Sequence, residues 1–174
     1  NFYNKLTTNL SAAERVFDIL DTPAEIHDKQ GAKALPNLKG EVEFAHVTFA
    51  YEDALEKKIL EDVNFTVKPG ETIALVGPTG AGKTTIVNLI ERFYEVTEGK
   101  ILLDGYSIQD VTLQSLRSQM GIMTQDNFLF SGTIRDNIRY GRLDATDEEI
   151  EEAAKAVNAH EFIMELENGY ETEI

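Results

Sequence analysis

The chain has 174 residues, of which 42% are apolar, so it is long enough for one compact domain with a hydrophobic core. Acidic residues outnumber basic residues 31 to 16, which gives a formal net charge of −15. This balance argues against a nucleic-acid partner and against simple electrostatic docking on anionic lipid, because both need clustered lysine and arginine. The lack of cysteine excludes disulfides and thiolate metal sites, and no apolar run approaches the ~18 residues of a membrane span.

Residues 1–21 predict a helix, because apolar side chains recur at spacings of three and four, as on one helix face. These side chains are Leu6, Leu10, Ala13, Phe17 and Leu20. Residues 22–40 carry Pro23, Gly31 and Pro36 among polar residues, and we interpret them as a linker. A folded domain is therefore expected from residue 41 to residue 174.

The first half of this domain predicts strands. Residues 41–51 alternate imperfectly between apolar and polar, and residues 59–67 are a second strand candidate, so the two predict an antiparallel edge. Residues 72–76, with the sequence TIALV, form a short continuous apolar run of the kind buried on both faces of a parallel sheet. Residues 100–105 predict a strand that ends in an Asp-Gly turn, and residues 119–125 predict a further buried strand.

Helices are expected between and after these strands. One helix is predicted from about Lys83 to Tyr94, and a short one from Leu113. The last part of the chain is predicted to be helical, because Thr133 can cap one helix and Thr146 can form a capping box with Glu149 at the start of another.

The segment GPTGAGKT at residues 77–84 matches the phosphate-binding pattern G-x-x-x-x-G-K-[ST]. Its glycines permit backbone conformations that let the loop amides converge on an anion at a helix N-terminus. Lys83 supplies a positive charge for the β- and γ-phosphates of a nucleotide, Thr84 offers its hydroxyl to Mg²⁺, and Thr85 is placed to reach the α-phosphate. The predicted nucleotide contacts in this region are Gly77, Pro78, Thr79, Gly80, Ala81, Gly82, Lys83, Thr84 and Thr85.

Two other P-loop classes lack their own motifs in this sequence. GTPases read guanine with Asn-Lys-x-Asp late in the fold, but the only Asn-Lys pair is Asn4-Lys5, followed by Leu6 and Thr7 and far from the loop. A P-loop kinase would need catalytic motifs that the sequence does not contain. Neither class is therefore favoured.

Four segments follow one another in a characteristic order. They are VTFAYED at 47–53, VNFTVKPGETIALVGPTGAGKTT at 63–85, GKILLDGYSI at 99–108 and MGIMTQDNFLFSGTIRDNI at 120–138. In this order and spacing they resemble the nucleotide-binding domain of an ATP-binding cassette (ABC) transporter of the exporter branch. The resemblance covers residues 41–174, and AAERVFDILDTPAEI at 12–26 resembles the segment that joins the last membrane helix to this domain.

The resemblance implies a function and further site residues. Tyr51 matches the aromatic residue that stacks on adenine, and Gln125 matches the Q-loop glutamine that approaches Mg²⁺ and the attacking water. The parent protein would be an ATPase that couples ATP hydrolysis to export. The expected cofactors are ATP and Mg²⁺, and the expected partners are a transmembrane domain and a second nucleotide-binding domain at the cytoplasmic face of the membrane.

Several parts of the family pattern have no match. The sequence contains no LSGGQ signature and no switch histidine after an acidic strand end. Asp104, at the end of ILLD, is the only candidate Walker B acid, but Gly105 follows it and favours a turn. We therefore expect an α/β P-loop core sheet with an antiparallel edge and a partial helical subdomain, incomplete at the C-terminus.

This expectation leaves two functions open. The chain is either the ATP-binding part of an exporter, binding ATP without its own hydrolytic residues, or a stand-alone nucleotide-binding or regulatory module that never hydrolyses.

Overall fold

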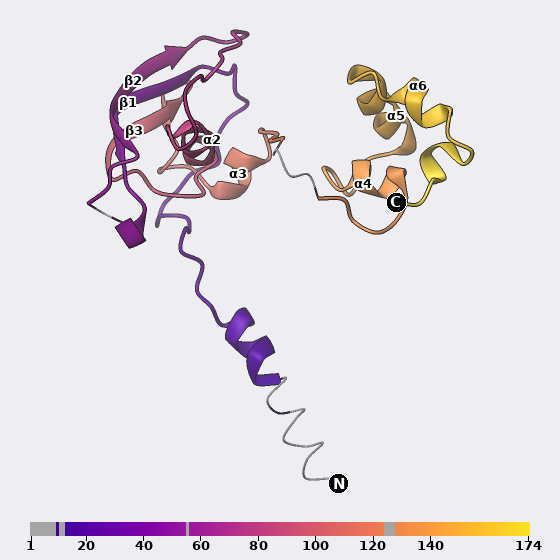
Figure 1. Cartoon of the computed structure of the whole chain (residues 1–174), viewed down its shortest axis with the longest axis horizontal. Coiled ribbons are helices and arrows are strands. Elements are labelled where there is room, and N and C mark those ends of the chain that lie inside the picture. Colours follow the sequence, from indigo (N-terminus) through magenta and orange to yellow (C-terminus); the bar gives the residue numbers. More distant parts are fainter. Residues whose placement is uncertain (1–9, 11–12, 55, 124–127) are drawn as a thin grey trace. The chain divides into compact units, whose positions relative to one another are not determined.

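The computed structural model describes residues 10, 13–54, 56–123 and 128–174. It divides into two compact units, Asn1–Gly121 and Ile122–Ile174 (Figure 1). Each unit has its own cluster of buried apolar side chains, so each is described by itself.

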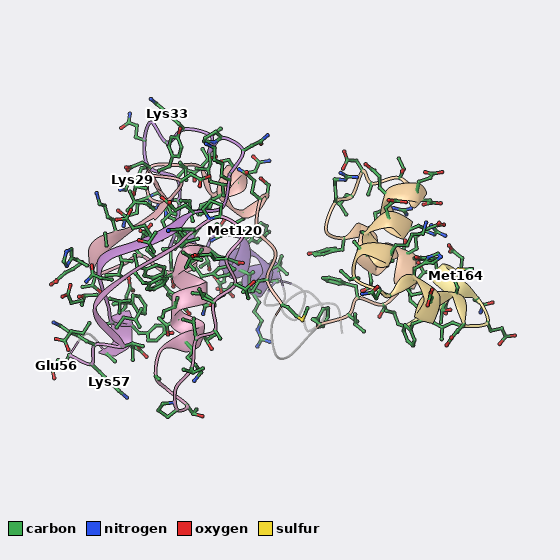
Figure 2. The ribbon with its side chains drawn as sticks, turned by 90° about the horizontal axis from the view of Figure 1, so that it is seen from above. Lys29, Lys33, Glu56, Lys57, Met120 and Met164 are labelled. Carbon is green, nitrogen blue, oxygen red and sulfur yellow. The ribbon has the colours of Figure 1, made fainter. Side chains whose placement is uncertain are left out.

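The first unit is built on a four-stranded antiparallel sheet with the strand order β2-β1-β3-β4. Its strands are β1 (Val42–Phe49), β2 (Leu60–Val67), β3 (Glu98–Leu103) and β4 (Tyr106–Ser107). These strands confirm the expected antiparallel pair and the expected strand before the Asp-Gly turn. Figure 2 shows Glu56 and Lys57 at an outer edge of this unit, in the connection between β1 and β2.

A bulge in β1 explains why its apolar residues alternate imperfectly. Phe44 and Val47 are both buried although they are three positions apart. The backbone of His46, which lies between them, adopts a left-handed φ of 52°, and the β1–β2 register shifts at the same place. The extra residue turns the second half of the strand inward again, so that Phe49 also enters the core.

The helices α2 (Lys83–Ile90) and α3 (Leu113–Arg117) pack against this sheet in the first unit. Leu89 of α2 and Leu116 of α3 join the same core cluster as Phe44 of β1. The helix predicted to reach Tyr94 ends at Ile90, because Arg92 adopts a left-handed φ of 54° and breaks the helical course.

The strands predicted at 72–76 and 119–125 are wrong for the residues that the structure describes. Neither 72–76 nor 119–123 forms a strand, and Ile73 and Val76 are 50% and 88% exposed. A strand buried on both faces needs hydrogen-bonded neighbours along its edges and helices over its faces. The sheet of this unit pairs only β1 to β4 with one another, so these apolar runs gain no partner in the described part of the chain.

The segment interpreted as a linker follows the surface of the first unit from residue 27 to residue 40. Lys33 forms a parallel bridge with Val111, and the amide of Leu35 donates to Ser115 Oγ over 2.8 Å. The Leu35 side chain is buried in the core of the unit. These contacts hold the segment against the folded domain although its composition is typical of a loop.

The helix expected at the N-terminus is present at residues 13–20, within the described residues. Phe17 and Leu20 on its predicted apolar face are 59% and 70% exposed. No helix in the described part of the chain combines the length and the apolarity needed to cross a membrane.

The second unit is helical and corresponds to the expected partial helical subdomain. It contains α4 (Ile134–Arg139), α5 (Asp147–Ala156), α6 (His160–Met164) and the short 3₁₀ helix η2 (Gly169–Glu171). The predicted caps are confirmed, because Thr133 and Thr146 each form a capping box with the side chain three residues later. Its small core consists of Ile150, Ala154, Ile163 and Tyr170.

Candidate nucleotide-binding site

The glycine-rich loop leads directly into α2. Gly77, Gly80 and Gly82 all have positive φ, of 154°, 84° and 87°. Gly82 is the N-cap of α2, and a Cβ atom there would lie 2.8 Å from Leu60 Cδ2. The left-handed backbone therefore favours glycine at this position, and a larger residue would also displace the Leu60 side chain of β2.

Lys83 folds back over the loop that precedes it. Its Nζ donates to the carbonyl oxygens of Gly77 and Pro78, both over 2.8 Å. The turn in between is closed by a bond from the Ala81 amide to the Pro78 carbonyl, at 3.2 Å. The ammonium group thus lies against the loop, next to the first turn of the helix.

The start of α2 is suited to an anion. The first amides of an α-helix have no acceptor within the helix, and they carry the positive end of its dipole. The first turn of α2 contains no acidic residue, although the chain as a whole is strongly acidic. The positive charge of Lys83 adds to the positive end of the helix dipole. The electrostatic potential at the start of α2 is therefore positive, although the chain as a whole is negatively charged.

Thr84 and Thr85 point in different directions. Thr84 is exposed, whereas Thr85 is only 5% exposed and shares the buried side of α2 with Leu89. The Thr85 hydroxyl lies 3.2 Å from the hydroxyl of Tyr51, within hydrogen-bond distance. The structure therefore connects the predicted base-stacking residue to the helix that begins at the predicted phosphate loop.

Tyr51 belongs to a group of three aromatic rings. Its ring makes edge-to-face contacts with Phe49 at a centroid distance of 4.9 Å and with Tyr94 at 5.1 Å. These rings border a cavity of about 420 Å³ whose rim includes Glu52 and Asp53. The edge-to-face contacts fix the ring of Tyr51 from two sides.

The remaining predicted residues are accounted for as follows. Pro78, Thr79 and Ala81 lie on the exposed surface of the loop. Gln125 lies outside the residues that the structure describes, so its predicted approach to Mg²⁺ stays a prediction.

Asp104 is engaged as a turn residue. Its carboxylate accepts hydrogen bonds from the amides of Gly40 at 3.2 Å and Glu41 at 2.9 Å, and also from the amide of Lys39. These bonds, above all the one from Glu41, hold the pKa of Asp104 below its usual value. Among the described residues no group of three or more acidic, histidine or cysteine side chains is arranged to hold a metal ion.

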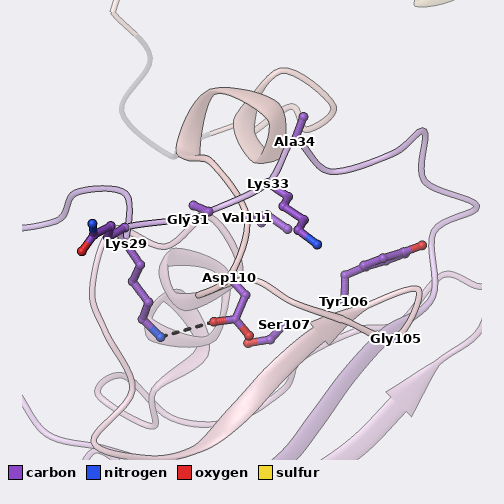
Figure 3. A pocket seen from close by; sticks show the side chains of 11 residues that line it. Lys29, Gly31, Lys33, Ala34, Gly105, Tyr106, Ser107, Asp110 and Val111 are labelled. Carbon is purple, nitrogen blue, oxygen red and sulfur yellow. Dashed lines mark hydrogen bonds and ion pairs between the residues drawn. The ribbon is translucent and has the colours of Figure 1, made fainter.

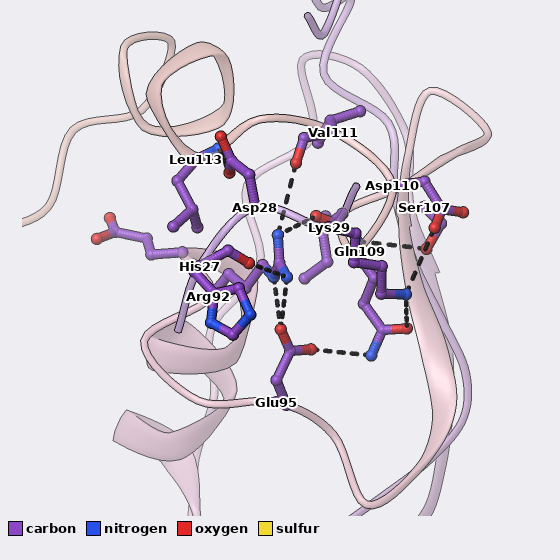
Figure 4. A network of polar contacts seen from close by, with 12 residues as sticks. His27, Asp28, Lys29, Arg92, Glu95, Ser107, Gln109, Asp110, Val111 and Leu113 are labelled. Atoms are coloured by element: carbon purple, nitrogen blue, oxygen red, sulfur yellow. Dashed lines mark hydrogen bonds and ion pairs between the residues drawn. The ribbon is translucent and has the colours of Figure 1, made fainter. Parts of the chain in front are cut away.

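A buried arginine, not identified from the sequence, connects several segments of the first unit. Arg92 is 2% exposed, and it donates to the His27 carbonyl at 3.2 Å and to the Glu95 carboxylate at 2.7 Å (Figure 4). Glu95 in turn accepts a bond from Gln109 at 2.9 Å. The network connects the end of α2 to the segment before β1. The burial of Arg92 could not be predicted from the sequence, because an arginine that follows a helix is usually exposed.

A second cavity, of about 520 Å³, lies under the segment 29–34 and beside β4 (Figure 3). In its lining, Lys29 Nζ lies 3.5 Å from Asp110 Oδ1, and Tyr106 contributes from the start of β4. None of the predicted nucleotide contacts lines this cavity, so it is separate from the candidate site.

A glycine-rich loop that encloses a lysine and opens a helix is the arrangement of a P-loop protein. A family model described as "ABC transporter" matches residues 60–170. The chain therefore belongs to the ABC transporter family.

Individual relatives agree with this assignment. An uncharacterised ABC transporter ATP-binding protein of Bacillus subtilis is 52% identical over 172 residues, which cover 99% of this chain and 28% of the relative. A fatty acid ABC transporter ATP-binding/permease protein of Mycobacterium tuberculosis is 49% identical over 172 residues, or 99% of this chain and 27% of the relative. An ATP-dependent lipid A-core flippase of Syntrophus aciditrophicus is 47% identical over 174 residues, or 100% and 28%.

A solved structure gives the same result for the fold. It is the structure of a bacterial Atm1-family ABC exporter with ATP bound, and it superposes with a TM-score of 0.83 at 41% sequence identity. The match covers 99% of this chain and 30% of that chain. The chain thus spans less than a third of the length of these relatives.

Proposed function

We propose that this chain is the ATP-binding portion of an ABC-type exporter and that it binds ATP with Mg²⁺ at residues 77–85. The observation that carries the proposal is the geometry of Lys83. Its ammonium group has three N–H donors, and two of them are directed to the carbonyls of Gly77 and Pro78. The third donor is then available to a phosphate oxygen while the lysine stays anchored on the loop.

The helix start supplies the other half of the phosphate site. The first amides of α2 would donate to the phosphates, and the glycine conformations at positions 77, 80 and 82 leave no side chain in the way. The exposed hydroxyl of Thr84 would join the coordination shell of Mg²⁺, which keeps most of its water ligands in nucleotide sites. Gln125 would approach the same ion, as the family resemblance implies.

The base would stack on Tyr51. Base–aromatic stacking contributes about 1–3 kcal/mol in single-stranded nucleic-acid complexes, and a similar contribution is expected here. The ring is already held by Phe49 and Tyr94, so little side-chain freedom would be lost on binding.

We infer that this chain acts as part of a longer protein, of the length of its relatives, in which ATP binding and hydrolysis drive export across a membrane. The chain would lie at the cytoplasmic face, beside a transmembrane domain and a second nucleotide-binding domain. The relatives named as a fatty acid transporter and a lipid A-core flippase point to membrane transport as the role of the family members most like this chain. The alternative of a stand-alone regulatory module is not favoured, because the relatives are named as transporter proteins.

Titration calorimetry with MgATP tests the binding proposal. Lys83→Ala removes a charge-assisted hydrogen bond, which is worth about 1.5–3 kcal/mol, so we expect ATP affinity to fall about 10- to 150-fold. Lys68→Ala, in an exposed turn outside the loop, is the matched control and should bind like the unmodified chain. Equal affinity of the Lys83 and Lys68 variants would refute the assignment of the loop.

A further inference from the structure

The hydroxyls of Tyr51 and Thr85 lie close together, although Tyr51 is assigned to the base of a nucleotide and Thr85 to its α-phosphate. Tyr51 follows β1, and Thr85 lies in the first turn of α2, 34 positions further along the chain. Their oxygens are 3.2 Å apart, and either one can donate. The contact therefore spans the interval between the expected base platform and the expected phosphate loop.

The surroundings of Thr85 show that this pairing is specific. A threonine hydroxyl inside a helix commonly bonds to the carbonyl three or four residues earlier. The hydroxyl of Thr85 instead lies within hydrogen-bond distance of a residue from another element, and Thr85 is only 5% exposed.

The ring of Tyr51 has three points of support. Phe49 and Tyr94 contact it edge to face, at interplanar angles of 82° and 87°. The aromatic contacts hold the body of the ring, and the Thr85 hydroxyl holds its polar tip. Of these contacts, the hydroxyl bond is the one that ties the ring to α2.

We propose that Thr85 is a positioning residue that fixes the base-stacking ring of Tyr51 at a set distance from the phosphate loop. The inference rests on the proposed nucleotide site and adds a role that the phosphate pattern does not contain. Through this bond, the helix that begins at the phosphates also orients the ring that receives the base. A nucleotide then meets both parts of its site already aligned, and it loses less entropy on binding than it would with a mobile ring.

The test compares MgATP with magnesium tripolyphosphate, which has the phosphates and no base. Tyr51→Phe keeps the ring and removes only its hydroxyl, so it is expected to weaken MgATP binding about two- to tenfold and to leave tripolyphosphate affinity unchanged. Thr85→Val, at a residue that is also expected to reach the α-phosphate, should weaken MgATP binding at least as much. Thr85→Ser, which keeps a hydroxyl, should restore the affinity for MgATP.

A double variant and a surface control complete the design. The double variant Tyr51→Phe with Thr85→Val should lose no more MgATP affinity than Thr85→Val alone, because the tyrosine change removes a bond that Thr85→Val has already removed. Thr66→Val, on an exposed position of β2, should bind both ligands like the unmodified chain. Tyr51→Phe alone is sufficient to decide the matter if Thr85→Val does not fold.

Three results would overturn the inference, and they differ in which variant and which ligand are affected. Unchanged MgATP affinity in Thr85→Val or Tyr51→Phe means that the contact does not position the ring. Equal weakening of MgATP and tripolyphosphate in Tyr51→Phe means that the tyrosine hydroxyl does not act through the position of the base. Failure of the unmodified chain to bind either ligand would remove the proposed function itself, together with the inference that rests on it.

Discussion

At the scale of single residues, Asp104 is a carboxylate whose function is decided by its neighbours. It directly follows β3, where a metal ligand of a P-loop ATPase would be sought, but the amides of residues 39–41 donate to its oxygens. Its own φ of 48° and the φ of 83° at Gly105 form the tight turn that the Asp-Gly sequence predicts. The turn could be predicted from the sequence. The hydrogen bonds from residues 39–41 to the carboxylate could not, because these residues are distant from Asp104 in the chain.

The lowered pKa of Asp104 predicts how stability depends on pH. Because the folded pKa lies below the ordinary value of 3.8, the charged carboxylate stabilises the fold above that pH, and this contribution is lost as the pH falls through the folded pKa. Asp104→Asn should therefore lower the melting temperature at pH 7, and the difference from the unmodified chain should shrink below pH 3.8. Thermal unfolding at a series of pH values measures this difference, and a gap that stays constant with pH would contradict the assignment.

At the scale of elements, the sheet depends on a glycine opposite the bulge in β1. A Cβ atom on Gly99 would lie 2.1 Å from the carbonyl oxygen of His46, and Gly99 has a φ of 81°. Gly105 has nearly the same φ, of 83°, with nothing within 4 Å of its Cβ position. Substitution of Gly105 therefore tests backbone strain alone, whereas substitution of Gly99 tests backbone strain together with a steric clash.

Substitution of these glycines by alanine tests the bulge. Gly105→Ala should cost about 1–2 kcal/mol of unfolding free energy, the cost of a left-handed backbone at a residue with a Cβ atom. Gly99→Ala should cost a further ~1–3 kcal/mol, because the added methyl group must displace the β1 backbone. Urea unfolding followed by circular dichroism measures both values. Equal losses in the two variants would show that the close approach of β1 and β3 is not maintained in solution.

The elements also show which parts of the fold the sequence could predict. The antiparallel strands, the Asp-Gly turn and the caps at Thr133 and Thr146 depend on residues close together in the chain, and all are present. Apolar continuity predicts strands at 72–76 and 119–125, but neither 72–76 nor the described residues 119–123 form one. A strand forms only with partners to pair with, and apolar continuity does not reveal whether those partners are present.

The same limit applies to the candidate site. The phosphate loop could be predicted because its pattern is contiguous, from Gly77 to Thr84. The contact between Tyr51 and Thr85 and the burial of Arg92 both join segments distant in sequence. Neither has a local pattern, since a threonine in a helix and an arginine after one are ordinary surface residues in most sequences.

At the scale of the whole molecule, the position of Asp104 bears on whether this chain can hydrolyse the ATP that we propose it binds. P-loop ATPases hold Mg²⁺ with an acidic residue at a strand end and position the attacking water with a further polar side chain. Asp104 is the only acidic residue directly after a described strand, and its carboxylate is bound by backbone amides. Binding of ATP and its turnover are therefore expected to be separable in this chain.

We accordingly expect phosphate release under saturating MgATP to stay well below about 1 per second, the low end of ordinary turnover numbers. Loss of general-base assistance alone slows a reaction by about 10²- to 10⁴-fold. A colorimetric phosphate assay measures the rate, with Lys83→Ala as the control for contaminating ATPases. A rate near 1 per second that Lys83→Ala abolishes would show that the chain contains a catalytic group, and Asp104 would be the first to replace.

The central claim is that ATP binds to the glycine-rich loop at the start of α2, and amide NMR tests it most directly. In ¹H–¹⁵N spectra of the isotope-labelled chain titrated with MgATP, the largest shifts should occur at the amides of Gly80, Gly82, Lys83 and Thr84, with smaller shifts at Tyr51. Shifts concentrated in the segment 29–34, which borders the separate cavity, or no saturable shifts in the loop, would contradict the account.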